Sequence, residues 1–599
     1  MKFADYLANY LYKKKLKNIF SITGAGSMHF NDSIGSHPGL NVIYTHHEQA
    51  AAMAAEGEAR ISRLPGVVNV STGPGGTNTL TGVTGAWVDS IPMLVISGQV
   101  MKKDIGTNIG YRQLGVQEAN VVDMARPVTK FCKTIMNPYD IEIIFDEAIK
   151  ISLEGKPGPV WVEIPLDVQS FNLDIKKIKK TKRNKALNKK TNKISQNLKD
   201  RILNLISKSK KPIIISGYGI RSAKAEKDLV EFINLTKIPL TTSWNTIDLI
   251  NSSSENVIGR SGVFGDRASN YAVQKCDLLI VLGSRMSTAQ VGYMDDMFSV
   301  NSKKIYVDIS KKELNKPTFK ADIKIQEDVK IFLKSINIEL KKKNIKNNQF
   351  KNWREKILFL KNKYQIVKEH QKKEKGFINS FRFINEMSKK LNANDIVVTD
   401  MGTSFTCTMQ SFKAKDHQRI FTSSGLASMG YGLPAAIGAC VGSKKNRVIC
   451  LTGDGGLMFN VQELQTVIHY NLPIKIFVID NDGYLTQKLM QIKNFKRYVG
   501  AHPKSGVSCP DFVKIGKAFN FETSFINSDI LQTKLLNKIL KNNKPHLCVV
   551  KMNPMQPLHP RVVMKMNKDG SFDRVGLESV FPFLESEEHK NNLKMLEDI

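Results

Sequence analysis

Short apolar runs rich in β-branched residues recur along the chain, and they end at glycine, polar or acidic positions. The clearest runs are Val67–Ser71, Met93–Ser97, Pro212–Ser216, Leu278–Leu282, Arg447–Thr452 and Ile474–Ile479. Ala-rich or amphipathic stretches with helical spacing lie between them. Continuous apolar runs that alternate with helices are typical of parallel strands covered on both faces. The pattern therefore predicts an α/β fold, in which ligands bind beyond the carboxyl ends of the strands.

The length of the chain predicts several domains. A chain of 599 residues is too long for one hydrophobic core. Its content of 41% hydrophobic residues excludes disorder, collagen and coiled coil as descriptions of the whole. Two lysine-rich stretches separate the patterned segments, and connectors usually occupy such places. We predict three doubly wound parallel-sheet domains and a tail, over residues 1–170, 195–335, 376–555 and 556–599.

The formal net charge of +33 is concentrated in these two stretches. Residues 176–211 hold 15 Lys and Arg against the single Asp200, and residues 334–375 hold 14 against four glutamates. Neither stretch has the glycine loops or interleaved aromatic residues that would read bases. We interpret them as solvated linkers and surface helices, and expect no nucleic-acid partner. A basic nucleic-acid-binding protein on an α/β scaffold stays open as a third hypothesis.

Cysteine spacing and hydropathy predict the compartment. The seven cysteines form no C-x-x-C pair, which indicates reduced residues rather than a zinc site. The first 20 residues carry lysines within a helical pattern and lack the apolar core of a signal peptide. No run approaches the roughly 18 apolar residues that span a bilayer. We predict a cytoplasmic enzyme with no membrane partner.

The most informative segment is Arg447–Asn460, where an apolar run enters Gly453-Asp454-Gly455-Gly456. Glycines let backbone N–H groups approach phosphate oxygens, and an aspartate at a strand end can hold a divalent cation. Asn481 follows 27 residues after Asp454, enough for one helix and a return strand. Gly-Asp-Gly alone also fits an ordinary turn. Paired with Asn481, it predicts a Mg²⁺ site made by Asp454, Asn481 and a backbone carbonyl near Gly483.

These residues resemble the signature of thiamine diphosphate (ThDP)-dependent enzymes. Several other segments resemble the acetolactate synthase large subunit family, in order from the N-terminus to about residue 555. They are His46–Gly57, Val67–Asn78, Asp89–Gln99, Ser424–Gly438 and Asn460–Leu464. The resemblance implies a pyrimidine-binding first domain, a central domain and a diphosphate-binding third domain. It also implies a homodimer or homotetramer, because the first domain of one subunit faces the third domain of another in this family.

The resemblance assigns roles to individual residues. Glu48 matches the glutamate that binds the pyrimidine ring, although a helix N-terminus favours a glutamate by itself. Met429 matches the apolar residue beneath the cofactor, although methionine is more often core packing. Gln117 matches the glutamine of a Phe-Gln-Glu sequence usual in that family, and we place it in the catalytic set with Glu48 and Met429. The expected cofactor-binding residues are Glu48, Gly402, Thr403, Ser404, Met429, Gly453, Asp454, Gly455, Gly456, Asn481 and Gly483.

The central third resembles the FAD-contacting part of acetolactate synthase, where the flavin has no redox task. The matching residues are Lys156, Gly217, Gly219, Gly283, Ser284, Arg285, Asp308 and Ile309. Lys156 stands where that family usually has an arginine, and lysine lacks the planar fork of a guanidinium. We therefore expect FAD beside ThDP and Mg²⁺.

The implied reaction is decarboxylation of a 2-keto acid, pyruvate, with transfer of the two-carbon unit to a second 2-keto acid, as in branched-chain amino acid biosynthesis. The acceptor side departs from the family at Val116, Thr486, Met490 and Leu166. Replacing bulky aromatic residues widens a pocket, and threonine adds a hydrogen-bonding group. The alternative is therefore the same donor chemistry with a larger acceptor, such as a keto-sugar nucleotide in surface-polysaccharide biosynthesis.

Overall fold

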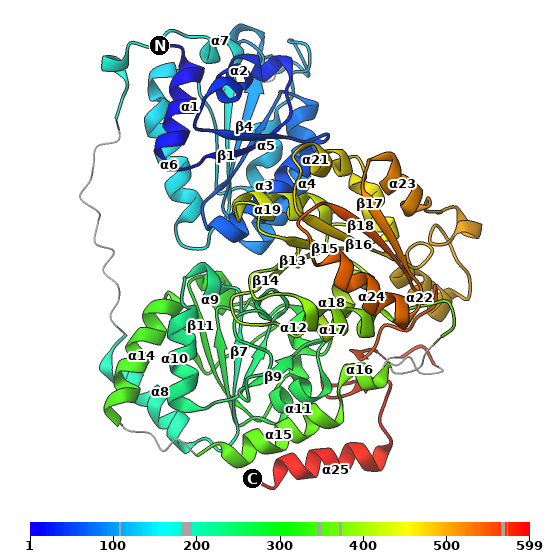
Figure 1. The fold of residues 1–599 in the computed structure, drawn as a ribbon. Coiled ribbons are helices and arrows are strands. Elements are labelled where there is room, and N and C mark those ends of the chain that lie inside the picture. Colours follow the sequence, from blue (N-terminus) through cyan, green and yellow to red (C-terminus); the bar gives the residue numbers. More distant parts are fainter. Residues whose placement is uncertain (107–108, 181–193, 344–348, 371–373, 565–568, 572) are drawn as a thin grey trace.

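The computed structural model describes the chain except residues 107–108, 181–193, 344–348, 371–373, 565–568 and 572 (Figure 1). Its core is three separate six-stranded sheets whose neighbouring strands all run parallel. The six strands expected from the apolar runs are confirmed, each within one or two residues. This arrangement is the predicted α/β fold with three doubly wound domains.

The first sheet has the strand order β2-β1-β3-β4-β6-β5. Its strands are β1 (Asn18–Ser21), β2 (Asn41–Tyr44), β3 (Gly66–Val70), β4 (Met93–Gln99), β5 (Phe131–Thr134) and β6 (Pro159–Pro165). All residues of β3, β4 and β6 are buried, as expected for strands covered on both faces. The principal helices around this sheet are α1 (Phe3–Lys13), α2 (Met28–Ser36), α3 (Glu48–Ser62), α4 (Pro74–Asp89) and α6 (Ile141–Leu153).

The third sheet repeats the topology of the first, with the order β14-β13-β15-β16-β18-β17. Its strands are β13 (Ile396–Thr399), β14 (Arg419–Phe421), β15 (Val448–Gly453), β16 (Ile474–Asp480), β17 (Glu522–Ile526) and β18 (His546–Lys551). After β13 the chain turns to one side to form β14, and it then crosses back to form β15 on the other side. This reversal places the ends of β13 and β15 at a topological switch point, where open α/β sheets bind ligands.

The middle sheet has a different order, β12-β11-β10-β7-β8-β9. Its strands are β7 (Pro212–Ser216), β8 (Leu240–Thr242), β9 (Val257–Arg260), β10 (Leu278–Leu282), β11 (Lys303–Asp308) and β12 (Ile323–Gln326). Counted from β7, this is the 3-2-1-4-5-6 order of dinucleotide-binding folds, with its switch point between β7 and β10. Ile214 packs into one core and Ile213 and Ile215 into another, so helices cover both faces.

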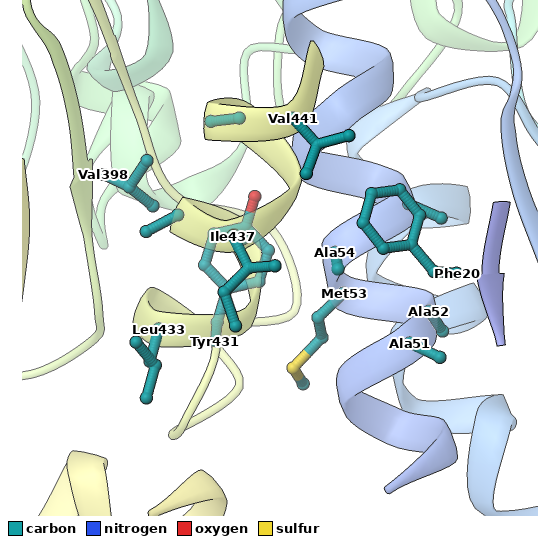
Figure 2. Packing of buried hydrophobic residues seen from close by; sticks show 14 of the residues in the cluster. Phe20, Ala51, Ala52, Met53, Ala54, Val398, Tyr431, Leu433, Ile437 and Val441 are labelled. Atoms are coloured by element: carbon teal, nitrogen blue, oxygen red, sulfur yellow. The ribbon is translucent and has the colours of Figure 1, made fainter. Parts of the chain in front are cut away.

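The first and third domains join through α3 and α19 (Gly432–Gly442), which lie side by side in Figure 2. Small residues let the two backbones touch: a Cβ on Gly438 would lie 1.7 Å from the Ala54 carbonyl oxygen. The buried Arg60 of α3 pairs with Glu56 at 2.5 Å and with Asp89 at 2.7 Å. This tight junction fixes the orientation of the helix that begins at Glu48.

The second lysine-rich stretch is more than a connector. It forms the end of α14 (Val329–Lys343), then α15 (Lys351–Lys363) and α16 (Ile366–Glu369), and Trp353 of α15 is fully buried in the middle-domain core. Residues 181–193 of the first stretch lie outside the described residues, and α8 (Gln196–Lys208) follows them. The limits of the three domains along the chain stay predictions.

The tail packs against the middle domain. Strands β19 (Arg561–Val562) and β20 (Val580–Phe581) pair antiparallel, and α25 (Ser586–Glu597) lies along α11 (Arg267–Lys275) and α15, as Figure 1 shows. Lys275 of α11 and Glu597 of α25 form an ion pair at 2.7 Å. Among the described helices, none is both long and apolar enough to cross a membrane.

Candidate active site

The ends of β15 and β16 bring Asp454 and Asn481 together. The parallel register pairs Gly453 with Ile479, so the residues that follow are neighbours. Oδ2 of Asp454 accepts hydrogen bonds from the backbone N–H groups of Asn481, at 3.2 Å, and Gly483, at 2.8 Å. Asp454 is 1% exposed, and this burial raises its pKa to about 6. The spacing expected from the sequence therefore corresponds to direct contact.

Asn481 has a buried side-chain oxygen that could bind a cation. Its side-chain N–H₂ donates to Oγ1 of Thr403 at 3.2 Å, which leaves Oδ1 as the free end of the amide. Oδ1 is buried and has no hydrogen-bond partner among the described residues. Leaving a buried acceptor unpaired costs about 1–3 kcal/mol. A hard cation beside Asp454 would satisfy this oxygen, so the residues present fit Mg²⁺.

The third expected metal ligand is the backbone near Gly483. The Gly483 carbonyl oxygen accepts a hydrogen bond from Leu485 N–H at 3.2 Å, and a carbonyl oxygen has a second lone pair for a cation. No cluster of three or more His, Cys, Asp or Glu side chains suited to a metal occurs in the part of the chain that the structure describes. A site here therefore depends on amide and backbone oxygens beside one carboxylate, which are the ligands that Mg²⁺ accepts.

Two of the expected cofactor glycines face open space. No heavy atom lies within 4 Å of where a Cβ would stand on Gly402 or on Gly453. Gly402, at φ +83°, precedes α18 (Thr403–Ser411), and Gly453 precedes α20 (Asp454–Leu457). The first N–H groups of a helix have no intrahelical partner and attract anions. These openings at the switch point therefore suit a diphosphate.

Three other expected cofactor residues have structural roles. A Cβ on Gly455 would lie 2.2 Å from the Tyr484 ring, and one on Gly456 would lie 2.8 Å from an Asp400 oxygen. These two glycines therefore permit close packing around the turn. Ser404 directs its hydroxyl to the Asp400 carbonyl oxygen at 3.1 Å, so only its backbone N–H is left for a ligand.

Met429 lies half-buried in the turn before α19, and Asp400 holds that turn. Oδ1 of Asp400 accepts the Gly430 N–H at 3.1 Å, and Asn460 donates to the Gly430 carbonyl oxygen at 2.8 Å. Burial raises the pKa of Asp400 to about 6. The sequence analysis missed Asp400, although an aspartate at the end of an apolar run two residues before Gly402 was a usable signal.

The first domain contributes Glu48 and Gln117. Glu48 begins α3 and accepts a hydrogen bond from the Asn78 side chain at 3.0 Å. Gln117 has a left-handed backbone at φ +65°, and its carbonyl oxygen lies against Gly73, where a Cβ would approach to 2.3 Å. The Gln117 side chain is exposed. Along the chain, Glu48 lies after β2 and Gln117 lies after β4 of the first sheet.

Two contacts tie the Glu48 segment to the third domain of the same chain. The His46 N–H donates to Glu463 at 2.9 Å, and the Met53 sulfur lies 4.0 Å from the Asn460 side-chain nitrogen. Burial raises the pKa of Glu463 to about 7. No hydrogen bond or ion pair between described residues joins Glu48 to Asp454. Glu463 was also missed as a site residue, although it lies in a segment that carried the family resemblance.

A cavity of about 670 Å³ opens at the switch point of the middle sheet. All three domains contribute to its lining, for example Asp89 from the first, Arg285 from the second and Ser424 from the third. Seven of the eight residues expected to contact FAD line it: Lys156, Gly219, Gly283, Ser284, Arg285, Asp308 and Ile309. The eighth, Gly217, lies against Gly283, where an added Cβ would stand 2.2 Å from the carbonyl oxygen.

Three cationic residues of this cavity, Lys156, Lys316 and Arg285, are already bonded to other residues of the chain. Lys156 contacts Glu313 at 2.6 Å, and Lys316 contacts the same carboxylate. The Arg285 guanidinium donates to the Val88 carbonyl oxygen at 2.6 Å. Asp308, at the end of β11, accepts the Ser310 N–H, and burial raises its pKa to about 6. The cavity lies at the switch point of a sheet with the strand order of dinucleotide-binding folds, so it suits a dinucleotide.

Comparisons with known proteins agree with this arrangement. Models of the thiamine pyrophosphate (ThDP) enzyme N-terminal TPP binding domain, central domain and C-terminal TPP binding domain match residues 1–124, 200–336 and 400–550. The probable acetolactate synthase large subunit of Methanocaldococcus jannaschii is 32% identical over 569 residues, which cover 93% of each chain. The isozyme 2 large subunit of Escherichia coli acetolactate synthase is 29% identical, over 94% of this chain and 97% of its own. The chain therefore belongs to the thiamine pyrophosphate enzyme family and is a ThDP-dependent enzyme similar to acetolactate synthase large subunits.

Proposed function

We propose that this enzyme decarboxylates pyruvate and transfers the two-carbon unit to a second 2-keto acid, with ThDP and Mg²⁺ as cofactors. The unpaired, buried Oδ1 of Asn481 beside Asp454 is the observation that carries the cofactor assignment. The similarity to acetolactate synthase large subunits along 93% of the chain supports the reaction.

The residues of the third domain bind and orient the cofactor in this proposal. Asp454, Asn481 and the Gly483 carbonyl hold Mg²⁺, and the open backbones at Gly402 and Gly453 receive the diphosphate. When bound, ThDP supplies the carbon centre at which the keto acid loses carbon dioxide. The hydrogen bond from the Asn481 amide to Thr403 Oγ1 keeps that amide turned so that its oxygen would face the cation.

Glu48 acts on the pyrimidine ring in this proposal. Its carboxyl group would hold a ring nitrogen and share a proton with it, and the hydrogen bond from Asn78 orients that carboxyl group. Met429 would support the cofactor, since it lies in the turn that Asp400 and Asn460 hold. Gln117 of the first domain is the third residue that we assign to the catalytic set.

We further propose that FAD occupies the middle-domain cavity. Its volume and its place at the switch point of a dinucleotide-type sheet support this assignment. Absorbance of the flavin in purified protein, and its release on denaturation, tests it directly. Purified protein that carries no flavin and takes up none from solution would contradict it.

We propose a homodimer or homotetramer in which the first domain of one subunit meets the third domain of another. Glu48 is half-buried, and the hydrogen bond that its side chain accepts from Asn78 stays within its own domain, which supports completion of the site by a second copy. Mass measurement by light scattering tests this. The cytoplasmic location stays a prediction.

The decisive experiment is an assay with pyruvate as the sole substrate at saturating ThDP and Mg²⁺. The proposal requires acetolactate and carbon dioxide as products. A second candidate keeps the donor chemistry but uses a larger acceptor, and the open face of α22 (Leu485–Phe495) favours it: Thr486 is exposed and Met490 is 46% exposed. Carbon dioxide release from pyruvate only when a keto-sugar nucleotide is added would support this candidate and contradict the first.

A further inference from the structure

Lys488 is a fully buried cation directly behind the candidate metal loop. It lies on α22 and is 0% exposed, whereas its neighbours Thr486 and Gln487 face solvent. Its ammonium group donates to the carbonyl oxygens of Asn481, at 2.8 Å, and Asp482, at 3.1 Å. Burying an ammonium group is expensive unless its protons are bonded. These two bonds therefore explain how the chain tolerates a charge at this position.

The loop that Lys488 contacts has an unusual backbone. Asp482 has φ +61° and Gly483 has φ +104°, so two consecutive residues are in left-handed conformations. A non-glycine residue in this region is uncommon and is held there by its surroundings. The Asp454 carboxylate accepts the N–H groups of Asn481 and Gly483 from one side. Lys488 holds the carbonyl groups of Asn481 and Asp482 from the other side.

We propose that Lys488 is a positioning residue for the Mg²⁺ site, an inference that rests on the proposed function. It acts through the backbone of Asn481 and Asp482 and touches no cofactor. By fixing these two carbonyl groups it keeps the Asn481 side chain and the Gly483 carbonyl aimed at the same point as Asp454. Partners of this kind behind metal ligands typically change metal affinity about 10- to 100-fold when they are replaced.

The charge of Lys488 and its hydrogen bonds have opposite effects on the affinity of the site for a divalent cation. Variants that separate the two effects therefore test the positioning role. A positive charge beside the site repels a divalent cation, so removing the charge alone would tighten metal binding. Removing the hydrogen bonds would loosen the loop and weaken metal binding. Lys488→Met removes both. Lys488→Gln removes the charge but keeps N–H groups that can donate to a carbonyl.

The experiment measures the affinity of Mn²⁺, as a probe for Mg²⁺, by electron paramagnetic resonance at saturating ThDP. We expect Lys488→Met to bind Mn²⁺ about 10- to 100-fold more weakly than the unaltered protein, and Lys488→Gln to recover most of this loss. The matched control is Lys475→Met, at the opposite end of β16. Lys475 is also 0% exposed and also bonded to oxygens, of Asn542 and Lys544, so it reports the general effect of removing a buried lysine.

Each outcome decides the question. If Lys488→Met melts like Lys475→Met and binds Mn²⁺ as tightly as the unaltered protein, or more tightly, the positioning role is wrong. If Lys488→Met fails to fold, Lys488→Arg decides, because arginine keeps the charge but cannot place its N–H groups as an ammonium group does. Weaker Mn²⁺ binding than in the unaltered protein then supports the role, and equal binding overturns it. Failure of the proposed function looks different, because the unaltered protein would then bind Mn²⁺ and ThDP without turning over pyruvate, or would bind neither.

Discussion

The diphosphate end of the third sheet and the cavity of the middle sheet both lie at topological switch points, but they are prepared for ligands in different ways. At the third sheet the Asn481 oxygen is buried and has no hydrogen-bond partner among the described residues, so an added cation could satisfy it. In the middle cavity Lys156 is paired with Glu313, and Arg285 is bonded to a carbonyl group. The first site therefore holds a buried acceptor without a hydrogen-bond partner, whereas the cations of the second are already bonded to residues of the chain. We therefore expect metal and ThDP to be essential for activity. We expect the protein to fold without the flavin.

The strongest test of this difference removes the metal ligand. We expect Asp454→Asn to lower pyruvate turnover by roughly 1000-fold or more, because charge stabilisation by a metal contributes several kcal/mol to a barrier. Calorimetry should show loss of Mg²⁺-dependent ThDP binding, while the flavin content stays unchanged. Asp480→Asn is the control, since Asp480 lies at the same strand end but pairs with Lys551. Equal losses in both variants would show that the effect is structural.

Glu48→Gln separates chemistry from binding. We expect decarboxylation to fall by roughly 100- to 10,000-fold, the range for losing a general acid–base group, with ThDP still bound. Steady-state rates and calorimetry on the same preparation check this. Asn78→Ala, which only removes the bond to Glu48, should have a smaller effect. Full activity in Glu48→Gln would refute its assigned role.

Gly217→Ala addresses the middle cavity alone. The added Cβ would stand 2.2 Å from the Gly283 carbonyl oxygen, and overpacking of this kind costs about 1–3 kcal/mol. Displacing the ends of β7 and β10 should weaken flavin binding roughly 10- to 100-fold, as 1.4 kcal/mol corresponds to a factor of ten. Flavin absorbance gives the measurement. If Mg²⁺-dependent ThDP binding falls equally, the middle cavity and the third-sheet site are coupled. The two sites could then not be treated as independent.

Asp308→Asn gives the smallest expected effect and has a defined pH dependence. Burial raises the pKa of Asp308 to about 6, above its usual 3.8, so folding favours the protonated form. Its contribution to stability is present below pH 4 and is lost as the pH rises through 6. The substitution should therefore raise the free energy of unfolding at pH 7 by at most about 3 kcal/mol, and by nothing at pH 4. Urea unfolding at both pH values checks this, and equal gains at both would contradict it.

Much of the fold followed from local pattern. The runs at Pro212–Ser216 and Leu278–Leu282 coincide with β7 and β10, because strands buried on both faces are apolar at every position. The Asp454 to Asn481 spacing also predicted that these two residues meet, since adjacent parallel strands bring their ends together. Asp400 and Glu463 were missed because they act by bonding to turns distant in the sequence, at Gly430 and His46.

The sequence by itself determined the strands, the three-sheet architecture and the residue types at the strand ends, because hydrophobic periodicity and turn chemistry are local. Only the tertiary structure decided which of those residues have polar atoms without a hydrogen-bond or ion-pair partner. It paired Lys156 with Glu313, buried the hydroxyl of Ser404, and left the oxygen of Asn481 without a partner. It also placed Lys488 behind the metal loop, although its neighbours on α22 are exposed. The pairing and burial of these polar atoms depend on distances between segments that meet only when the sheets pack. These distances cannot be inferred from spacing along the chain.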